Sequence, residues 1–316
     1  MDNKIYVSSS PHFNFKCSTQ MIMGTVLIAL LPEIIMGIVL FGVAALIRIL
    51  VSVASCVLFE FLFQKVTKQK IVIANLSACV TGVMMALVCP PTAPVWMFVV
   101  GAAVAMIVAK GLFGGIGSNV FNPALTGRAF MFLSFPAAMG ASWLAPKTIT
   151  AVDAVSSATT LSAIKAGTFA VEQGTYWQYF IGNRAGCIGE TSVLLILISF
   201  AFLTLAHIID WRAPVAMVGT VAICSLIAGE NVAMSLMTGG LMFGATFMVT
   251  DYATAPVTKN GRLVFGFGCG LITFLIRKLG GYPEGVMFSI LIMNSVAPFL
   301  NNLTARKYGY GKKEAK

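Results

Sequence analysis

Apolar runs long enough to cross a lipid bilayer are the feature that most constrains this chain. The run from Met21 to Phe63 has room for two membrane helices, because roughly 20 helical residues span the hydrocarbon core. Only 10% of all residues are charged, whereas a soluble domain has roughly 25%. Such a chain cannot cover its surface with charge, so the sequence predicts an all-α polytopic membrane protein.

About ten transmembrane helices are expected, since each apolar run approaches the length that a bilayer requires. Loops separate them; Cys89–Pro94, for example, contains three prolines and cannot continue a helix. Two spans are expected within residues 21–63, with Arg48 marking the start of the second. The others are expected at about 72–88, 95–109, 128–144, 192–209, 215–228, 263–276 and 286–303, with one more that ends in 239–251.

Two glycine-rich stretches, Gly111–Ala124 and Gly239–Asp251, interrupt this pattern late in each half of the chain. Glycines and polar residues at this density predict broken helices, which are tolerated at membrane depth where they are buried or face a cavity. With about five spans per half, the second half would be an inverted copy of the first. We therefore expect two inverted five-span repeats with broken helices, a urea-transporter-like architecture.

The whole chain is interpreted as a single membrane domain, residues 1–316. Its expected parts are repeat 1 at about 21–145, a polar segment at about 146–185, repeat 2 at about 186–303, and a basic tail at 304–316.

The net charge of +10 comes from basic residues scattered over loops and ends, which indicates membrane topology rather than nucleic-acid binding. Basic loops favour the cytoplasmic side, so both termini are expected there and the polar segment is expected outside. Arg277 and Lys278 argue the other way. The residues that carry the assignment are Lys65, Lys68, Lys70, Arg212, Lys259, Arg262 and the basic C-terminus.

Polar residues in or beside the two broken helices form a candidate site for a second flavin or for an ion path. Their amides, hydroxyls and charges could bind a polar ligand such as an isoalloxazine ring, or could only satisfy freed backbone groups. The sequence leaves both interpretations open. The candidates are Asn119, Asn122, Arg128, Thr246, Thr250 and Asp251.

Acidic residues within apolar runs are further candidates, because a charge at the bilayer centre costs about 2.5 kcal/mol or more. Glu33, Glu60, Glu230 and Asp251 are candidates for an ion path, with Asp251 preferred and Glu60 alternatively reaching the cytoplasmic interface. Glu190 is interpreted either as part of this set or as an acid at a helix N-terminus.

Classical catalytic and metal-binding patterns are missing from the sequence. His12 and His207 have no ligand spacing, and no metal site or catalytic residue is assigned. The seven cysteines lack CxxC spacing and are interpreted as small buried residues, with a ligand shared with a partner subunit as the alternative for one or two. No four-cysteine cluster or Rossmann fingerprint is present.

A hydroxyl-rich run in the polar segment, Asp153-x-x-Ser156-Ser157-Ala158-Thr159, supplies the most informative motif. No base lies beside Thr159 in the sequence, so its hydroxyl is expected to be an acceptor rather than a nucleophile of its own. The run resembles the signature at which flavin transferases attach FMN to threonine through a phosphoester. This resemblance implies that Thr159 bears the FMN and that Asp153, Ser156 and Ala158 are recognition positions. Ser157 stands where glycine is commoner.

The resemblance extends over nearly the whole chain, through the Gly114–Arg128, Gly189–Ser192, Phe243–Asp251 and Gly280–Gly285 motifs. Together these are similar to the RnfD family, the flavinylated membrane subunit of the ion-translocating ferredoxin:NAD oxidoreductase (Rnf) complex. A sister family is the B subunit of the sodium-translocating NADH:quinone reductase, which usually has a longer N-terminal extension.

Membership of the RnfD family would imply an electron-transfer subunit in a prokaryotic plasma (inner) membrane. Its expected cofactors are covalent FMN and noncovalent riboflavin. Its expected partners are the other complex subunits, including a second flavinylated one, a flavin transferase for maturation, and the lipid bilayer. Electron flow between ferredoxin and NAD would be coupled to sodium or proton translocation. Because fold alone does not decide function, a solute channel of urea-transporter-like fold is the alternative from another class.

Overall fold

A computed structural model describes residues 18–140, 143–144, 156–157, 174–281 and 284–304 of the chain. Within these residues the protein is a bundle of helices, accompanied by one two-stranded sheet of two residues per strand. The predicted helical class is confirmed, and the small antiparallel sheet is an addition that the sequence did not indicate.

The first half of the chain begins with two long helices joined by a single residue. Its elements are α1 Thr19–Phe41, α2 Val43–Val66, the 3-10 turn η1 Ile73–Asn75, α3 Ser77–Leu87, α4 Val95–Ala103, the π-helix η2 Val104–Gly111, α5 Pro123–Ser134 and α6 Pro136–Gly140.

The middle and second half contain shorter elements and two more long helices. These are β1 Trp143–Leu144, β2 Ser156–Ser157, α8 Thr175–Ile181, α9 Val193–Leu205, α10 Arg212–Ile227, α11 Val232–Met237, α12 Leu241–Phe243, the π-helix η3 Gly244–Met248, α13 Lys259–Leu279 and α14 Val286–Thr304.

Three described helices, α1, α2 and α14, are long and apolar enough to cross a membrane. Four shorter apolar helices accompany them, namely α3, α4 continued by η2, α9 and α10. Many large apolar side chains on these helices face outward; Val39 is 67% exposed and Ile227 is 80% exposed. Exposed apolar surface on apolar helices is what a lipid environment requires, so the chain is a membrane-embedded helical protein.

Among the predicted helix boundaries that differ from the structure, two have a clear local cause. The second span starts at Val43 rather than near Arg48, because Gly42 adopts a positive φ of 72° that ends α1 at once. The expected continuous span over 128–144 is also wrong. Helix α5 ends at Ser134, since Pro136 disfavours helical backbone in Phe135, whose φ is −133°.

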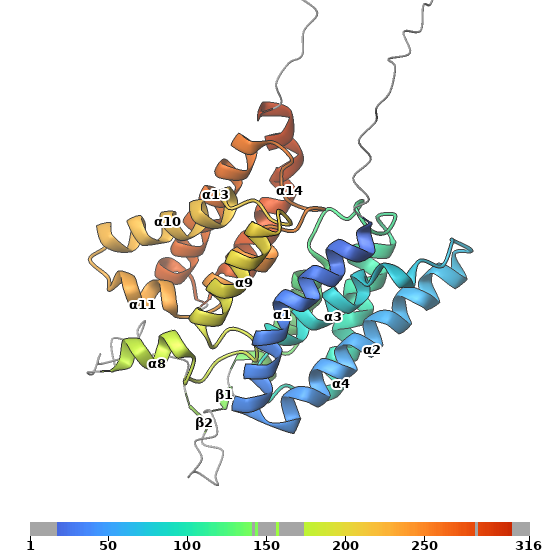
Figure 1. The fold of residues 1–316 in the computed structure, drawn as a ribbon, viewed down its shortest axis with the longest axis horizontal. Helices are drawn as coiled ribbons and strands as arrows, with labels where there is room; N and C mark the ends of the chain where they lie inside the picture. Colours follow the sequence, from blue (N-terminus) through green and yellow to red (C-terminus); the bar gives the residue numbers. More distant parts are fainter. Residues whose placement is uncertain (1–17, 141–142, 145–155, 158–173, 282–283, 305–316) are drawn as a thin grey trace, which may run out of the picture.

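Figure 1 shows the helices in two groups, with α1 to α4 on one side and α10, α11, α13 and α14 on the other. Helix α1 contacts α9, α2 contacts α3 and α4, and α10 contacts α13. The last pair approaches closely because Gly270 has no side chain; a Cβ there would lie 2.5 Å from the carbonyl oxygen of Met217. Small residues commonly allow such close approach between membrane helices.

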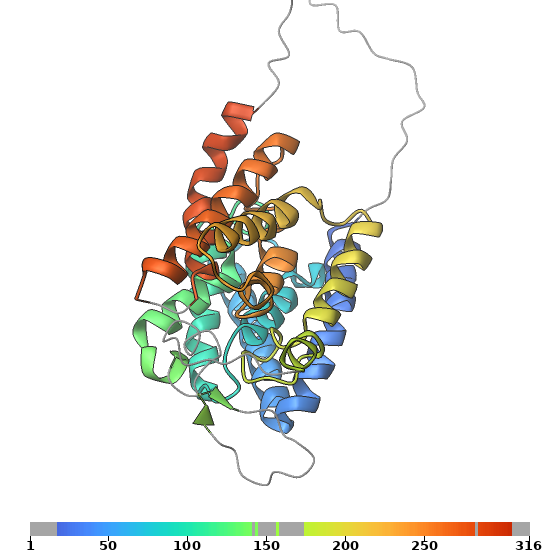
Figure 2. The same ribbon diagram turned by 90° about the vertical axis from the view of Figure 1, so that its left-hand side faces the viewer.

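The two ends of the described chain lie on the same side of the molecule. The start of α1 and the end of α14 are at one end, and the β1–β2 hairpin is at the opposite end, in both views (Figures 1 and 2). Met23, in the first turns of α1, therefore marks the same end as the C-terminus of α14. This arrangement defines two faces, referred to below as the terminal face and the hairpin face.

Candidate cofactor site and buried ion clusters

The two glycine-rich stretches meet in space through a pair of polar side chains. Asn122 Nδ2 donates a hydrogen bond of 3.2 Å to Asp251 Oδ2, although 129 positions separate the residues. The backbone N–H of Asn122 donates to Asn294 Oδ1 at 3.2 Å, and Asn294 Nδ2 donates to the Thr254 carbonyl at 3.3 Å. The structure thus brings together two of the predicted site residues and adds Asn294 from α14.

Local sequence explains why Asn122 and Asp251 are held in place. Asn122 is the N-cap of α5, and its Oδ1 accepts from the Leu125 N–H at 3.2 Å while Pro123 occupies the first helical position. Asp251 follows η3 and closes a turn, because its carboxylate accepts from the Ala253 N–H and the Thr254 hydroxyl, each at 3.2 Å. Both side chains are therefore oriented before any ligand binds.

Two cavities of about 60 Å³ each adjoin this polar pair. One is lined by Asn119, Asn122 and Asp251, the other by Thr246, Thr250 and Asp251. Met23 and Met84 line both cavities, so the predicted residues other than Arg128 line two adjacent cavities, together called the Asn122–Asp251 region, near the terminal face. The structure brings these five residues together.

The polar groups of this region suit a flavin ring, but its volume is too small for one. Amide, hydroxyl and carboxylate groups match the donors and acceptors on the polar edge of an isoalloxazine ring. The two cavities are smaller than the roughly 300 Å³ of an ordinary ligand pocket. A flavin fits only if side chains move, and the unbranched Met23 and Met84 are the adaptable ones.

Arg128 belongs to a different group of charges. Its Nη2 lies 3.1 Å from Glu284 Oε2, and its Nη1 lies 4.0 Å from Glu190 Oε1. The Glu190 carboxylate is therefore directed at Arg128, while Ser192 provides the cap of α9 by accepting from the Leu195 N–H at 3.4 Å. Glu190 is thus a buried ion partner two residues before the N-cap of α9, and its place in an ion path stays a prediction.

This group of charged side chains surrounds the break between α11 and α12. Arg277 donates to the carbonyls of Ser235 at 2.7 Å and Thr238 at 3.2 Å, and Arg184 donates to the carbonyl of Met237. On the other side of the break, the Glu284 carboxylate accepts from the Gly240 N–H. Cations thus satisfy the free carbonyls that end α11, and an anion satisfies the first free N–H of α12.

Gly240 is required at this break for steric reasons. A Cβ at this position would lie 2.5 Å from Glu190 Oε1 and 2.6 Å from Glu284 Oε1. The Gly239-Gly240 pair, which the sequence marks as a helix interruption, therefore leaves space for two carboxylates.

A second buried ion pair joins α2 and η2. Lys110 Nζ lies 2.6 Å from Glu60 Oε1 and donates to Ser77 Oγ at 2.6 Å, and both charged side chains are less than one-tenth exposed. Glu60 is thus a buried, paired acid, which excludes the alternative that it reaches the interface as an isolated charge.

The other acidic candidates lie apart from both clusters. Glu33 of α1 is buried and accepts from the Ser199 hydroxyl of α9 at 2.8 Å. Glu230 is about one-third exposed after α10, where it pairs with Lys278 at 2.6 Å. Lys278 and Arg277, which oppose the expected topology in the sequence, therefore each have a structural partner.

The flavinylation motif falls mainly outside the described residues, which include neither Asp153, Ala158 nor Thr159. The backbone of Ser156 lies in β2, where it pairs with Leu144 of β1.

Four residues of these clusters were missed from the sequence: Lys110, Arg184, Glu284 and Asn294. Glu284 lies in the Gly280–Gly285 motif, which the sequence distinguishes only by its family resemblance. Lys110 ends an apolar run, and its charge there was the one sequence signal that could have identified it as a site residue. Arg184 and Asn294 carried no local signal, because their partners come from distant segments.

Four of the six described cysteines match their interpretation as small buried residues, whereas Cys79 and Cys224 are partly exposed. Cys56, Cys89, Cys187 and Cys269 are buried, and none of the described cysteines is in a disulfide. Within the described residues, no three His, Cys, Asp or Glu side chains group closely enough to hold a metal ion.

Helix breaks lined by buried amides and ion pairs define a membrane-embedded helical protein with polar sites within its helical core. The chain belongs to the NQR2, RnfD, RnfE family, whose model matches residues 6–309. The predicted family resemblance is thereby confirmed.

Similar proteins include the D subunits of three ion-translocating complexes. That of the Na⁺-translocating ferredoxin:NAD⁺ oxidoreductase complex of Acetobacterium woodii is 43% identical over 315 residues, which cover 98% of each chain. That of the proton-translocating ferredoxin:NAD⁺ oxidoreductase complex of Clostridium ljungdahlii is 38% identical and covers 96% of this chain and 95% of its own. That of the ion-translocating oxidoreductase complex of Citrobacter koseri is 35% identical and covers 96% and 99%.

Proposed function

We propose that this chain is the D subunit of an ion-translocating ferredoxin:NAD oxidoreductase and that it carries FMN covalently on Thr159. The observation that carries the proposal is 43% identity, over nearly the full length, to a relative with that name. The Asp153–Thr159 motif adds the attachment site. Fluorescence of the denatured chain is the test: it is expected after co-expression with a flavin transferase, and a dark band would favour a solute channel.

The protein acts by positioning cofactors, and its partners handle ferredoxin and NAD. When bound, a flavin supplies one- and two-electron redox chemistry. In our proposal, Thr159 Oγ1 would bear the FMN through a phosphoester, and Asn122 and Asp251 would hold a noncovalent riboflavin. Asn119, Thr246 and Thr250 line the same region. A second flavinylated subunit of the complex is the proposed redox partner.

The coupling ion is sodium or a proton, and the names of two relatives differ in this respect. The buried acids Glu33 and Glu60 and the partly buried Asp251 are proposed as the groups that an ion passes. The nearest alternative is a role like that of the B subunit in a sodium-translocating NADH:quinone reductase, since the family description includes NQR2.

Two inverted five-helix repeats remain our proposal for the architecture. Supporting contacts recur in both halves: α2 contacts α4 as α10 contacts α13, and the final helices α5 and α14 contact each other. The shared face of the two described ends agrees with an even number of spans between them. We propose that the terminal face is cytoplasmic and the hairpin face, with the FMN segment, is extracytoplasmic in a prokaryotic plasma membrane.

Cysteine labelling tests this topology. In a chain whose native cysteines are replaced by alanine, Thr168→Cys is expected to react with an impermeant maleimide added to intact cells. Lys312→Cys, in the basic C-terminal tail, is the matched control and is expected to react only after lysis. The reverse pattern would show that the orientation is wrong.

Loss of noncovalent flavin tests the Asn122–Asp251 site. Asp251→Ala removes the carboxylate that orients Asn122, and hydrogen bonds to charged groups contribute about 1.5–3 kcal/mol. Riboflavin affinity is expected to fall at least about tenfold, measured as riboflavin released per chain on denaturation. Covalent fluorescence should not change. Glu230→Ala is the control acid outside the cavities, and unchanged riboflavin in Asp251→Ala would exclude this site.

A further inference from the structure

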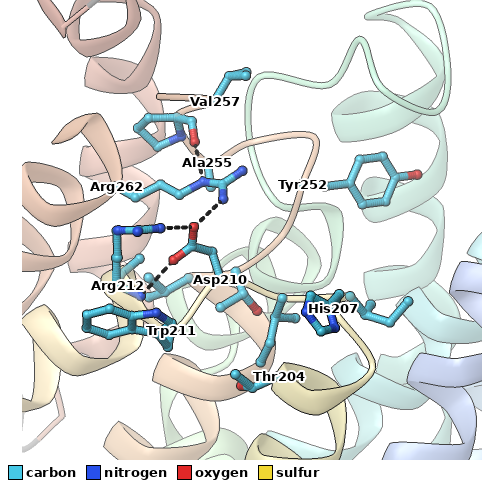
Figure 3. Close-up of a pocket in the computed structure, with 15 residues that line it drawn as sticks. Thr204, His207, Asp210, Trp211, Arg212, Tyr252, Ala255, Val257 and Arg262 are labelled. Carbon is cyan, nitrogen blue, oxygen red and sulfur yellow. Dashed lines mark hydrogen bonds and ion pairs between the residues drawn. The ribbon is translucent and has the colours of Figure 1, made fainter. Parts of the chain in front are cut away.

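A larger cavity of about 480 Å³ lies at the terminal face, separate from the ion pairs described above. Its walls come from the end of α9, the start of α10, the start of α13 and the loop between η3 and α13 (Figure 3). The loop is tied to the end of α14, because the Val257 N–H donates to Asn301 Oδ1 at 2.9 Å. The cavity therefore lies where several membrane helices end together.

Two arginines in this cavity share a single carboxylate. Figure 3 shows Arg212 and Arg262 on two sides of Asp210, and the bonded N–O distances are 2.7 and 2.8 Å. Although partial burial opposes the shift, hydrogen bonds from the Arg212 backbone N–H and from both guanidinium groups lower the pKa of Asp210. The carboxylate stays ionised at neutral pH, which leaves an excess of one positive charge.

The arrangement also leaves hydrogen-bond donors without protein partners. Hydrogen bonds occupy Nη1 of Arg212, and Nε and Nη1 of Arg262, while Nη2 of each arginine has no partner within the described part of the chain. Free N–H groups beside excess positive charge are the chemistry that receives an oxyanion.

Apolar side chains are exposed around the cavity. Leu205 is 78% exposed, Val257 is 74% exposed and the Trp211 ring is 49% exposed. Tryptophan is typical of the membrane–water interface, and basic pockets between membrane helices on the cytoplasmic side receive anionic headgroups. Charge inside the cavity and apolar surface around it match a molecule with an anionic head and hydrocarbon chains.

We propose that this cavity binds the phosphate group of an acidic phospholipid. Arg212 and Arg262 donate to the phosphate oxygens through their free Nη2 groups, and the acyl chains lie along Leu205 and Val257. The recognised chemistry is a phosphate anion, and soluble phosphate is its other source. The cavity shares Thr250 and Tyr252 with the neighbouring cavity of the proposed riboflavin site. Its two arginines and Asp210 take no part in that site, so the inference goes beyond the proposed function.

Thermal stabilisation of the full-length chain in detergent tests the proposal and identifies the source. Phosphatidylglycerol is expected to raise the unfolding midpoint, whereas phosphatidylcholine with the same acyl chains should not. Equal stabilisation by inorganic phosphate, with competition between the two, would assign the site to the soluble anion. If neither ligand shifts the midpoint, or if both lipids shift it equally, the proposal is wrong.

Variants separate specific binding from general attraction. The double change Arg212→Ala and Arg262→Ala is expected to weaken phosphatidylglycerol binding at least about tenfold, because two charge-assisted hydrogen bonds are lost. Lys278→Ala removes a positive charge from the opposite end of α13 and is expected to bind normally. Equal affinity in the double variant and the wild type would overturn the site.

Asp210→Asn is expected to change phosphatidylglycerol affinity in the opposite direction. It removes the carboxylate that competes for both arginines, so phosphatidylglycerol binding is expected to become several-fold tighter. If the three residues only stabilised the fold, this change would weaken binding as the arginine changes do. A loss of lipid affinity in Asp210→Asn would therefore contradict the proposal even if the double arginine variant failed to fold.

Discussion

Thr159→Ala is expected to abolish covalent flavin fluorescence while leaving the amount of folded chain unchanged. The phosphoester requires a hydroxyl oxygen at this position, and alanine has none. The measurement is ultraviolet-excited fluorescence of the chain on a denaturing gel, after co-expression with a flavin transferase. Because denaturation removes every noncovalent flavin, the signal reports the covalent bond alone, and the expected change is complete loss.

Neighbouring changes make this result specific. Thr160→Ala removes the adjacent hydroxyl and is expected to keep full fluorescence. Asp153→Ala alters a recognition position but retains the acceptor hydroxyl, so fluorescence is expected to fall through slower transfer. If fluorescence persists in Thr159→Ala and is lost in Thr160→Ala, the flavin is attached to Thr160 instead. Loss in neither would place the flavin outside this motif.

Local sequence predicted the parts of the candidate site that depend on chain breaks. Glycine and asparagine in two distant stretches indicated unwound backbone, and the structure joins those stretches through Asn122 and Asp251. The same reasoning missed Asn294, because α14 reads as an ordinary apolar helix. An amide inside such a run gives no sign of its partner until the helices are placed together.

Helix boundaries were less predictable where apolarity competed with a backbone signal. Phe135 and Pro136 mark the end of α5, yet the apolar residues beyond them suggested a continuous span. Gly42 ended α1 for a similar reason, as a residue with positive φ inside an unbroken apolar run. Hydrophobicity predicts that a segment is in the membrane, and glycine or proline predicts where its helix stops.

The pairing of charged side chains was the least predictable feature of the structure, because it depends on which residues are buried together. Lys278 and Arg277 are adjacent in α13, but Lys278 is 47% exposed while Arg277 contacts the carbonyls at the α11 break. The sequence treats both as topology signals. Their different roles depend on the helix α11 beside them, which no local pattern reveals.

Glu284→Ala is expected to be the most destabilising single change in the buried ion cluster. It leaves Arg128 without its closest anion and the Gly240 N–H without its acceptor. The carboxylate that Arg128 would then keep is that of Glu190, which lies farther away, at 4.0 Å. Removing one partner from a buried pair costs about 3–5 kcal/mol. The check is the thermal unfolding midpoint in detergent.

Two control variants test whether the loss of stability in Glu284→Ala comes from burial and from charge. Glu230→Ala also breaks an ion pair to a cation of α13, but its partner Lys278 is 47% exposed, so the expected cost is about 0–1 kcal/mol. Glu284→Gln keeps an acceptor for the Gly240 N–H and loses only the charge, so its midpoint should lie between those of Glu284→Ala and the wild type. Equal midpoints for Glu284→Ala and Glu230→Ala would mean that Glu284 does not neutralise Arg128, because the full cost arises only if the arginine is left buried and unpaired.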